Sequence, residues 1–387
     1  MKKLIYLDYQ ATTPCDKRVV EAMLPYFSEY FGNAHSDHVM GKVANDGVEI
    51  ARQQVADLIG AMRSEIIFTS GATEANNLAI IGAVRYLLKQ GHTARRVITV
   101  CTEHKCVLET IASLTVMGIE PVILPVDHQG QIDPQRLKAA LQIPTLLVSV
   151  MAANNETGVI HPIAKLAALA HEYGALFHCD MAQIVGKTET LFRVNDMGVD
   201  LASMSGHKIY GPKGVGALYV RRRPRVRLMP IIHGGGQERG NRSGTLPVPL
   251  IVGLGKACVL MQEEAKVEVE RFARYKRQMV EALQQVVPGL KINGSLFDSL
   301  PASLNLCFPS VKALDLLARI PHLCVSTGSA CTKSSVSPSY VLLEMGLSED
   351  EAFRSFRLSF GRMTTQKEVQ QAIHALSCAW HNAMTTR

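Results

Sequence analysis

Apolar residues in the first two thirds of the chain alternate between short continuous runs and longer stretches with helical spacing. A short apolar run bounded by turn residues is typical of a buried strand, and apolar positions three or four residues apart are typical of an amphipathic helix. In residues 162–173, for example, the apolar positions fall on one helical face and Gly174 follows as a stop signal. The pattern predicts strands at residues 65–69, 96–101, 121–126, 145–152 and 175–180, alternating with helices at residues 75–88, 105–117, from 133 onward and 162–173.

The order of these elements predicts an α/β fold, because repeated strand–helix–strand units build a largely parallel sheet with helices on both faces. The pattern changes beyond about residue 260. A long helix is predicted at residues 267–287, ended by Pro288 and Gly289, and shorter strands are predicted at residues 302–308 and 356–360. We therefore expect a second, smaller α+β domain, and a chain of 387 residues is long enough for two.

Composition and charge fit an ordinary globular protein. Hydrophobic residues make up 47% of the chain and charged residues 19%, which is too apolar for a disordered chain. The net positive charge is modest, and residues 221–227 contain five arginines. No aromatic residue interleaves with them, so direct nucleic-acid binding is not expected, and a solvated strand end followed by a loop is the preferred interpretation. Contact with an acidic partner stays open.

The nine cysteines are odd in number and lack the spacing of a disulfide framework, which favours a reducing compartment. Cys101, His104 and Cys106 resemble half of a zinc site, but no second pair stands at ligand spacing, so we expect no metal. The apolar run at the N-terminus is too short for a signal peptide, and no apolar stretch has membrane-spanning length. A cytoplasmic protein with no membrane contact is expected.

The first candidate chemistry is an amine paired with a carboxylate. Lys208 can supply an amine for an imine, and Asp180, which closes the predicted strand at 175–180, can hold a heteroaromatic nitrogen protonated. This pairing is what a pyridoxal 5′-phosphate site needs. Lys213 competes for the imine, but it lies in a turn that would expose it, whereas Lys208 follows Ser205 and His207, which can bind phosphate.

A phosphate site is predicted at the start of the helix that follows residue 69. Ala72 and Thr73 would offer backbone amides where the helix dipole favours an anion, and Thr73 adds a hydroxyl. Gln183 can reach the same crevice and bond a phenolic oxygen. A nucleotide-binding P-loop ending at residues 186–188 is excluded, because Met181 stands where its first glycine is required.

Two further residues stand out beside this crevice. His104 lies between a strand and a helix, where it could stack on a planar ring or move protons, although a purely structural histidine stays open. Cys331 lies in residues 325–339, which are dominated by Ser, Thr, Gly and Pro. We expect an exposed, mobile loop there, and an exposed thiol on such a loop suits a nucleophile that enters a site and leaves it again.

Eight segments now carry a specific resemblance. In family order, the chain is similar to a cysteine desulfurase of the NifS/IscS class at residues 6–14, 70–77, 102–105, 154–158, 205–214, 234–245, 328–331 and 357–362. The resemblance implies a fold-type I enzyme that binds pyridoxal 5′-phosphate, with a mostly parallel seven-stranded sheet in the large domain. It implies a large cofactor-binding domain at residues 15–260 and a small domain of residues 1–14 and 261–387 that carries the Cys331 loop. It also implies a homodimer that converts L-cysteine to L-alanine and leaves the sulfur as a persulfide.

The resemblance assigns roles residue by residue. Lys208 would hold the cofactor as a Schiff base and later move protons, Asp180 would pair with the pyridine nitrogen, and Gln183 with the ring hydroxyl. His104 would stack on the ring, beside Asn155, and Cys331 would accept the sulfur. The phosphate ligands would be Ala72, Thr73, Ser205 and His207, with Thr245 from the neighbouring subunit. Arg357 would grip the substrate carboxylate, assisted by Asn155 and Asn33.

Departures and alternatives remain. Met181 and the pair Ala152-Ala153 differ in size from the usual family residues, which bears on substrate preference. Another fold-type I enzyme, such as an aminotransferase or a selenocysteine lyase, would share Lys208 and Asp180 without depending on Cys331. A non-enzymatic module built on the arginine run would bind in a salt-sensitive way. The expected sulfur acceptor is an iron–sulfur scaffold protein, with tRNA thiolation and DNA phosphorothioation as alternatives.

Overall fold

The computed structural model describes residues 3–327 and 337–385. Its main feature is a seven-stranded sheet with the order β2-β8-β7-β6-β5-β3-β4. All neighbouring pairs from β7 to β4 are parallel, and β8 alone runs antiparallel to its neighbours, so the predicted mostly parallel sheet is confirmed. The strands are β2 (Ile66–Thr69), β3 (Arg96–Val100), β4 (Glu120–Leu124), β5 (Leu147–Ser149), β6 (Leu176–Asp180), β7 (Leu201–Ser205) and β8 (Gly216–Val220).

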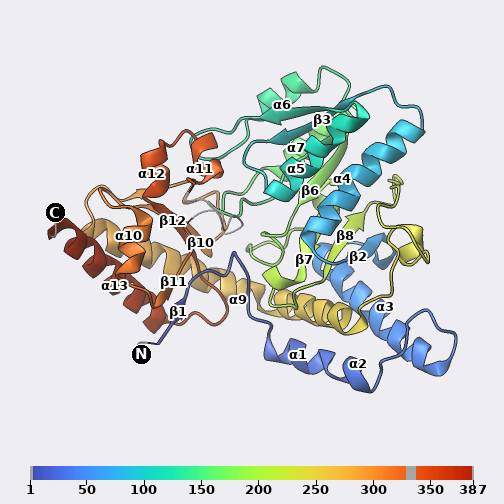
Figure 1. Ribbon diagram of the computed structural model, residues 1–387, viewed down its shortest axis with the longest axis horizontal. Helices are drawn as coiled ribbons and strands as arrows, with labels where there is room; N and C mark the ends of the chain where they lie inside the picture. The colour runs from blue at the N-terminus through green and yellow to red at the C-terminus, as the bar shows by residue number, and fades with distance from the viewer. Residues whose placement is uncertain (1–2, 328–336, 386–387) are drawn as a thin grey trace.

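Helices cover both faces of this sheet (Figure 1). Successive strand residues point to opposite faces, so the central strands contribute to two separate apolar clusters. One cluster joins the sheet to α4 and α5 through Ile67, Val97 and Leu147, and the other joins it to α3, α7 and α9 through Phe68, Ile98 and Val148. The helices of this part are α1 (Lys17–Met23), α2 (Pro25–Ser28), α3 (Val39–Ile59), α4 (Ala72–Lys89), α5 (Lys105–Ser113), α6 (Pro134–Ala140), α7 (Ile163–Glu172) and α8 (Val194–Met197).

The largest error of the sequence interpretation concerns α9, which spans Val248–Val286 and crosses residue 260 (Figure 1). The predicted start at residue 267 is wrong, because glycines at 253 and 255 lower the helical signal of the first half. Those glycines are required by packing: a Cβ on Gly255 would lie 2.6 Å from the Cα of Ala51 in α3. Close contact between α3 and α9 therefore overrides local propensity.

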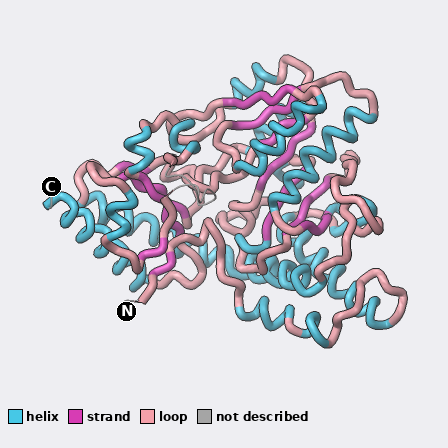
Figure 2. Tube along the Cα trace, in the orientation of Figure 1, coloured by secondary structure: helices cyan, strands magenta, loops and turns pink. Residues whose placement is uncertain are grey.

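A smaller α+β part lies apart from the large sheet, as predicted (Figure 2). The antiparallel order is β12-β10-β9, and β1 pairs in parallel with β11. The core of this part combines both ends of the chain, since Ile5 and Leu7 pack with residues of α9, β10 and α13. Its elements are β1 (Ile5–Tyr6), β9 (Lys291–Ile292), β10 (Ser303–Cys307), β11 (Leu323–Cys324), β12 (Ser355–Ser359), α10 (Ala313–Ala318), α11 (Tyr340–Glu344), α12 (Glu349–Phe353) and α13 (Gln366–Thr385).

Two sequence expectations concern surface features. The arginine run begins where β8 ends and continues into a largely exposed loop, as predicted, with Arg221 paired to Asp200 at 3.0 Å. Within residues 3–327 and 337–385, no helix is both long and apolar enough to cross a membrane.

Candidate active site

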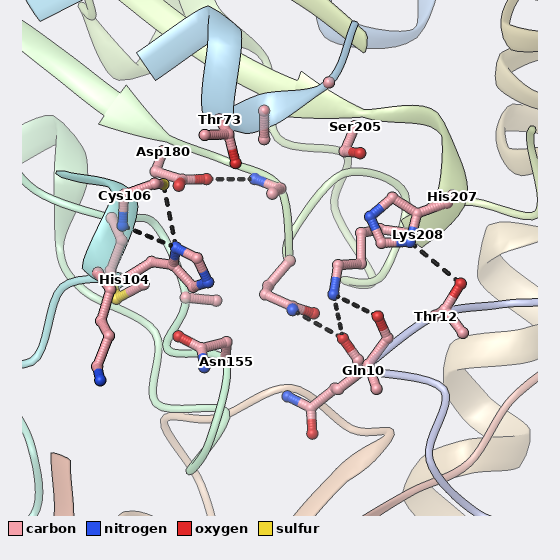
Figure 3. Close-up of a pocket in the computed structure, with 18 of the residues that line it drawn as sticks. Gln10, Thr12, Thr73, His104, Cys106, Asn155, Asp180, Ser205, His207 and Lys208 are labelled. Carbon is pink, nitrogen blue, oxygen red and sulfur yellow. Dashed lines mark hydrogen bonds between the residues drawn. The ribbon is translucent and has the colours of Figure 1, made fainter. Parts of the chain in front are cut away.

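A cavity of about 610 Å³ opens at the carboxyl edge of the large sheet, where ligands of open parallel sheets collect. Its walls come from the ends of β6 and β7, the start of α4, the N-terminal segment around Gln10, and β12 of the smaller part. The structure brings ten of the predicted site residues together in this cavity: Ala72, Thr73, His104, Asn155, Asp180, Gln183, Ser205, His207, Lys208 and Arg357. Figure 3 labels most of them.

Lys208 enters the cavity from the 3₁₀ turn Gly206–Lys208 that follows β7. Its Nζ donates hydrogen bonds to the backbone oxygens of Gln10 at 2.5 Å and Ala11 at 2.8 Å (Figure 3). Gln183 donates to the same Gln10 oxygen at 3.1 Å. The N-terminal segment therefore closes one side of the cavity and orients the amine, a role that sequence reasoning missed although residues 6–14 carried part of the resemblance.

Asp180 lies at the end of β6, and its carboxylate is buried. Oδ1 accepts a hydrogen bond from the backbone N–H of Ala182 at 2.9 Å, and Oδ2 accepts one from Asn76 of α4 at 2.7 Å. No lysine, arginine or histidine of the described chain forms an ion pair with Asp180 within 4.0 Å. A buried carboxylate held by neutral donors is suited to pair with a cationic group of a ligand.

His104 is the N-cap of α5, and its Nδ1 accepts a hydrogen bond from the backbone N–H of Cys106 at 3.2 Å. Burial lowers the pKa of His104, and the positive charges of Lys208 and Lys105 act in the same direction, whereas Asp180 opposes them. His104 is therefore neutral at pH 7, and its ring faces the cavity (Figure 3).

Uncapped donors gather at the start of α4. Its N-cap residue, Gly71, provides no side-chain cap, so the amides of Ala72 and Thr73 are available to an anion. This arrangement needs glycine, since a Cβ on Gly216 of β8 would lie 2.7 Å from the Cα of Gly71. Ser205 is buried on the same wall.

His207 lies beside Lys208 in the chain and also lines the cavity. Its Nδ1 lies 3.1 Å from the hydroxyl oxygen of Thr12. Burial lowers its pKa to about 4, with a further contribution from Lys208. His207 therefore offers a hydrogen bond and not a charge.

Comparisons with known proteins agree with this geometry. The family model described as Aminotransferase class-V matches residues 5–372. The chain belongs to the class-V aminotransferase family. It is 50% identical over 374 residues to "Cysteine desulfurase IscS" of Anaeromyxobacter sp. (strain Fw109-5), covering 96% of this chain and 91% of the relative. It is 48% identical over 378 residues to the human "Cysteine desulfurase", covering 97% of this chain and 81% of the relative.

Solved structures of this family share the fold. A "NIFS-LIKE PROTEIN" superposes with a TM-score of 0.89 at 36% identity, covering 97% of this chain and 98% of that one. The structure "SspA in complex with cysteine" superposes with a TM-score of 0.81 at 39% identity, covering 92% of this chain and 98% of that one.

Four buried polar atoms of cavity-lining residues have no hydrogen-bond partner among the described residues. They are Nε2 of Gln10, Oε1 of Gln183, Oδ1 of Asn155 and Nε of Arg357. Buried polar groups in folded proteins are almost always paired, so these residues of the cavity wall keep unused hydrogen-bonding capacity. The donor set also fits the cofactor of this family, because a primary amine, a buried carboxylate and uncapped helix amides stand on different walls of one pocket.

Arg357 of β12 approaches the cavity from the smaller part. Its guanidinium donates to the backbone oxygen of Asn155 at 2.6 Å and to the carboxylate of Asp8 at 2.6 Å. A substrate carboxylate would therefore compete with Asp8 for this arginine.

The remaining predicted residues lie elsewhere. Thr245 and Asn33 are exposed and do not line this cavity, and the Oδ1 of Asn33 accepts from the backbone N–H of His35 at 3.0 Å. Cys331 lies outside the described residues. Within the described ranges, no group of three or more His, Cys, Asp or Glu side chains is arranged to hold a metal, and Cys106 instead lines the cavity.

Proposed function

We propose that this class-V aminotransferase-family protein is a pyridoxal 5′-phosphate-dependent cysteine desulfurase that converts L-cysteine to L-alanine and forms a persulfide on Cys331. The observation that carries the proposal is that the amine of Lys208 and the buried carboxylate of Asp180 line the same cavity, and that Asp180 has no ion-pair partner among the described residues. Identity of 50% to a protein named cysteine desulfurase supports the same activity.

The cofactor would be held at three points. The amine of Lys208 would bond to its aldehyde, and Asp180 would keep its ring nitrogen protonated. The unpaired Oε1 of Gln183 would accept the ring hydroxyl. The phosphate would be held by the amides of Ala72 and Thr73 together with the side chains of Thr73, Ser205 and His207. When bound there, pyridoxal phosphate supplies an electron sink for the charge that develops at the substrate Cα.

The side chains around this point would orient the substrate and move its protons. Arg357 would exchange Asp8 for the substrate carboxylate in a two-pronged pair, with Asn155 and Asn33 assisting. Lys208 would transfer the proton at Cα, and the backbone oxygens of Gln10 and Ala11 fix the position of its Nζ before the substrate arrives. His104 would stack on the ring as a neutral imidazole.

The thiolate of Cys331 would then attack the substrate sulfur. An S–S bond forms and the C–S bond breaks, and the electron pair stays on the carbon fragment, which is protonated to alanine. One L-cysteine and one enzyme thiol give one L-alanine and one enzyme persulfide, so the step needs no external oxidant or reductant.

The test replaces Cys331 by alanine and compares it with Cys378→Ala, which removes an exposed thiol from α13. We expect the Cys331 variant to keep the yellow cofactor and to release no sulfide from cysteine, while the Cys378 variant behaves like the parent protein. Undiminished sulfide release by Cys331→Ala would overturn the role of this thiol and favour a lyase that acts without it.

We further propose that the active unit is a homodimer in which Thr245 of one subunit reaches the phosphate site of the other. Its exposed position outside the cavity supports this, because Thr245 does not reach the phosphate donors of its own chain. Mixing inactive Lys208→Ala and Thr245→Val chains should restore activity in hybrid dimers. Mixed dimers that form but stay inactive would reject a shared site.

The proposed acceptor is an iron–sulfur scaffold protein in the cytoplasm, where the eight described cysteines, all free, would stay reduced. Loading the enzyme with ³⁵S-labelled cysteine in an extract and isolating labelled proteins would identify the recipient. Label found only on a tRNA-modifying protein would contradict the scaffold assignment.

A further inference from the structure

Hydrogen bonds link the carboxylate of Asp180 to the ring of His104 through Asn76 and Cys106. Figure 3 shows Asp180, Cys106 and His104 close together. Asn76 of α4 donates from its amide nitrogen to Oδ2 of Asp180 at 2.7 Å and to Sγ of Cys106 at 3.1 Å. Sγ of Cys106 lies 3.0 Å from Nδ1 of His104. The line therefore connects a carboxylate at the end of β6 with a ring at the start of α5, and both side chains line the cavity.

The amide of Asn76 has one possible orientation. Its side chain is fully buried, and both amide hydrogens are used, one on each neighbour. The reversed amide would place its carbonyl oxygen against the carboxylate of Asp180, where two acceptors repel each other. The charge of Asp180 thus fixes Asn76 as the donor to Cys106.

Cys106 remains a thiol under these conditions. Burial raises its pKa to about 12, and the negative charge of Asp180 acts in the same direction. The sulfur accepts from Asn76, and the hydroxyl of Thr73 is a further donor to it. The S–H bond is left to donate, and Nδ1 of His104 is an acceptor at hydrogen-bond distance.

The backbone N–H of Cys106 donates to the same nitrogen at 3.2 Å. A nitrogen that accepts hydrogen bonds carries no proton, so in the neutral ring the proton resides on Nε2. Nε2 is directed into the cavity and has no hydrogen-bond partner among the described residues (Figure 3).

We propose that Cys106, held by Asn76, is a positioning residue that fixes His104 as the Nε2–H tautomer, so that His104 presents a hydrogen-bond donor to the cavity. The inference rests on the proposed function and deepens it, because Nε2–H of His104 would then donate a hydrogen bond to a substrate sulfur or an anionic group bound in the cavity. An imidazole with the opposite tautomer would present an acceptor there instead.

The surroundings of His104 define what a substitution at Cys106 changes. The charged groups facing the ring are Lys208 and Lys105, which oppose its protonation, and Asp180, which favours it. The S–H bond opposes protonation at Nδ1, because it requires the lone pair of that nitrogen. Loss of this one bond should raise the pKa of His104 by about half a unit to one unit.

The test uses ¹⁵N-histidine-labelled holoenzyme and long-range ¹H–¹⁵N spectra, with the His104 signals assigned by their loss in His104→Gln. In the parent protein we expect a proton on Nε2 and none on Nδ1. Cys106→Ala should raise the pKa of His104, Cys106→Ser should restore it, and Cys258→Ala, which removes a buried thiol from α9, should leave it unchanged.

A proton on Nδ1 in the parent protein would overturn the inference, as would equal pKa values in Cys106→Ala and the parent. Should Cys106→Ala fail to fold, Cys106→Val fills the space without a donor and replaces it. The proposed function is judged separately, since a protein without pyridoxal phosphate still reports its His104 tautomer, and a desulfurase with the other tautomer still releases sulfide.

Discussion

Two polar regions of this molecule differ in how completely their hydrogen bonds are made. The first, here named the Asp16 cluster, consists of Asp16, Arg18, Glu264, Glu268 and Arg362. Arg362 pairs with Asp16 at 2.8 Å and with Glu268 at 2.7 Å, and Arg18 pairs with Asp16 at 2.8 Å. The hydrogen bonds from Arg18 and Arg362 hold the pKa of Asp16 well below its usual range.

The second region is the cavity around Lys208, where several polar groups are unpaired. Gln183, Asn155 and Arg357 each keep a buried polar atom without a partner among the described residues. His104 and His207 are neutral because burial lowers their pKa values. Both regions are polar, but of the two only the cavity leaves buried hydrogen-bonding capacity for a ligand.

The two regions are therefore expected to have different roles, the Asp16 cluster in stability and the cavity in activity. The paired Asp16 cluster joins the N-terminal segment, α9 and the chain after β12, so its loss should cost stability. The cavity keeps its groups open, so its loss should cost activity. Substitutions in the two regions test whether stability and activity can be lost separately.

The largest effect is expected for Lys208→Ala. The variant loses the amine that binds the cofactor and transfers the proton, and a proton-transfer residue alone typically contributes about 100- to 10,000-fold to the rate. Sulfide release should fall by at least that factor, with no covalently held cofactor in the absorption spectrum. Lys213 also lines the cavity, and Lys213→Ala should keep the cofactor covalently attached. Loss of the attached cofactor in Lys213→Ala but not in Lys208→Ala would mean that Lys213 binds it.

Asp16→Asn should act on stability alone. Breaking a buried ion pair from one side typically costs about 3 kcal/mol. Folding lowers the pKa of Asp16. The ion pairs of Asp16 therefore contribute fully to the free energy of unfolding above the pKa of the unfolded chain, which is about 4, and this contribution is lost as the pH falls below that value. Urea unfolding should show a gap between parent and variant at pH 7 that narrows towards pH 3, with an unchanged cofactor spectrum. A loss of cofactor at equal stability would contradict the comparison.

The pattern predicted five of the seven strands of the large sheet, because these are apolar runs separated by helices with clear periodicity. It did not single out β7, where serines interrupt the apolar residues, or β8, which follows β7 without an intervening α-helix. Together with the resemblance, it also named ten residues that line one cavity. Asp180 and Ser205 end neighbouring strands at the same edge, whereas Asn155 and Arg357 were named only through the resemblance. It missed the first half of α9, where close packing against α3 requires glycines that lower the local helical signal.

The line from Asp180 to His104 could not be predicted for a different reason. Asn76 and Cys106 lie on separate helices, α4 and α5, and their contact depends on how these helices pack on the sheet. Cys106 was weighed only as half of a metal site, because spacing along the chain does not reveal a partner on another helix. Gln10 was missed likewise, since its backbone oxygen and not its side chain orients Lys208.

The smallest of these effects is expected for Arg357→Gln. The variant loses a charge-assisted pair with the substrate carboxylate, which should raise KM for cysteine by about 10- to 100-fold. Steady-state kinetics with cysteine would measure it. Arg354→Gln, which removes an arginine paired with Asp350 on the surface, should leave KM unchanged. Equal KM values for Arg357→Gln and the parent would place the carboxylate site elsewhere.

The most direct measurement is to reduce the purified protein with borohydride, digest it, and locate the pyridoxyl group by mass spectrometry. The account predicts a single modified peptide carrying the group on Lys208, absent from the Lys208→Ala protein. A pyridoxyl group on another lysine, or none at all, would contradict the account.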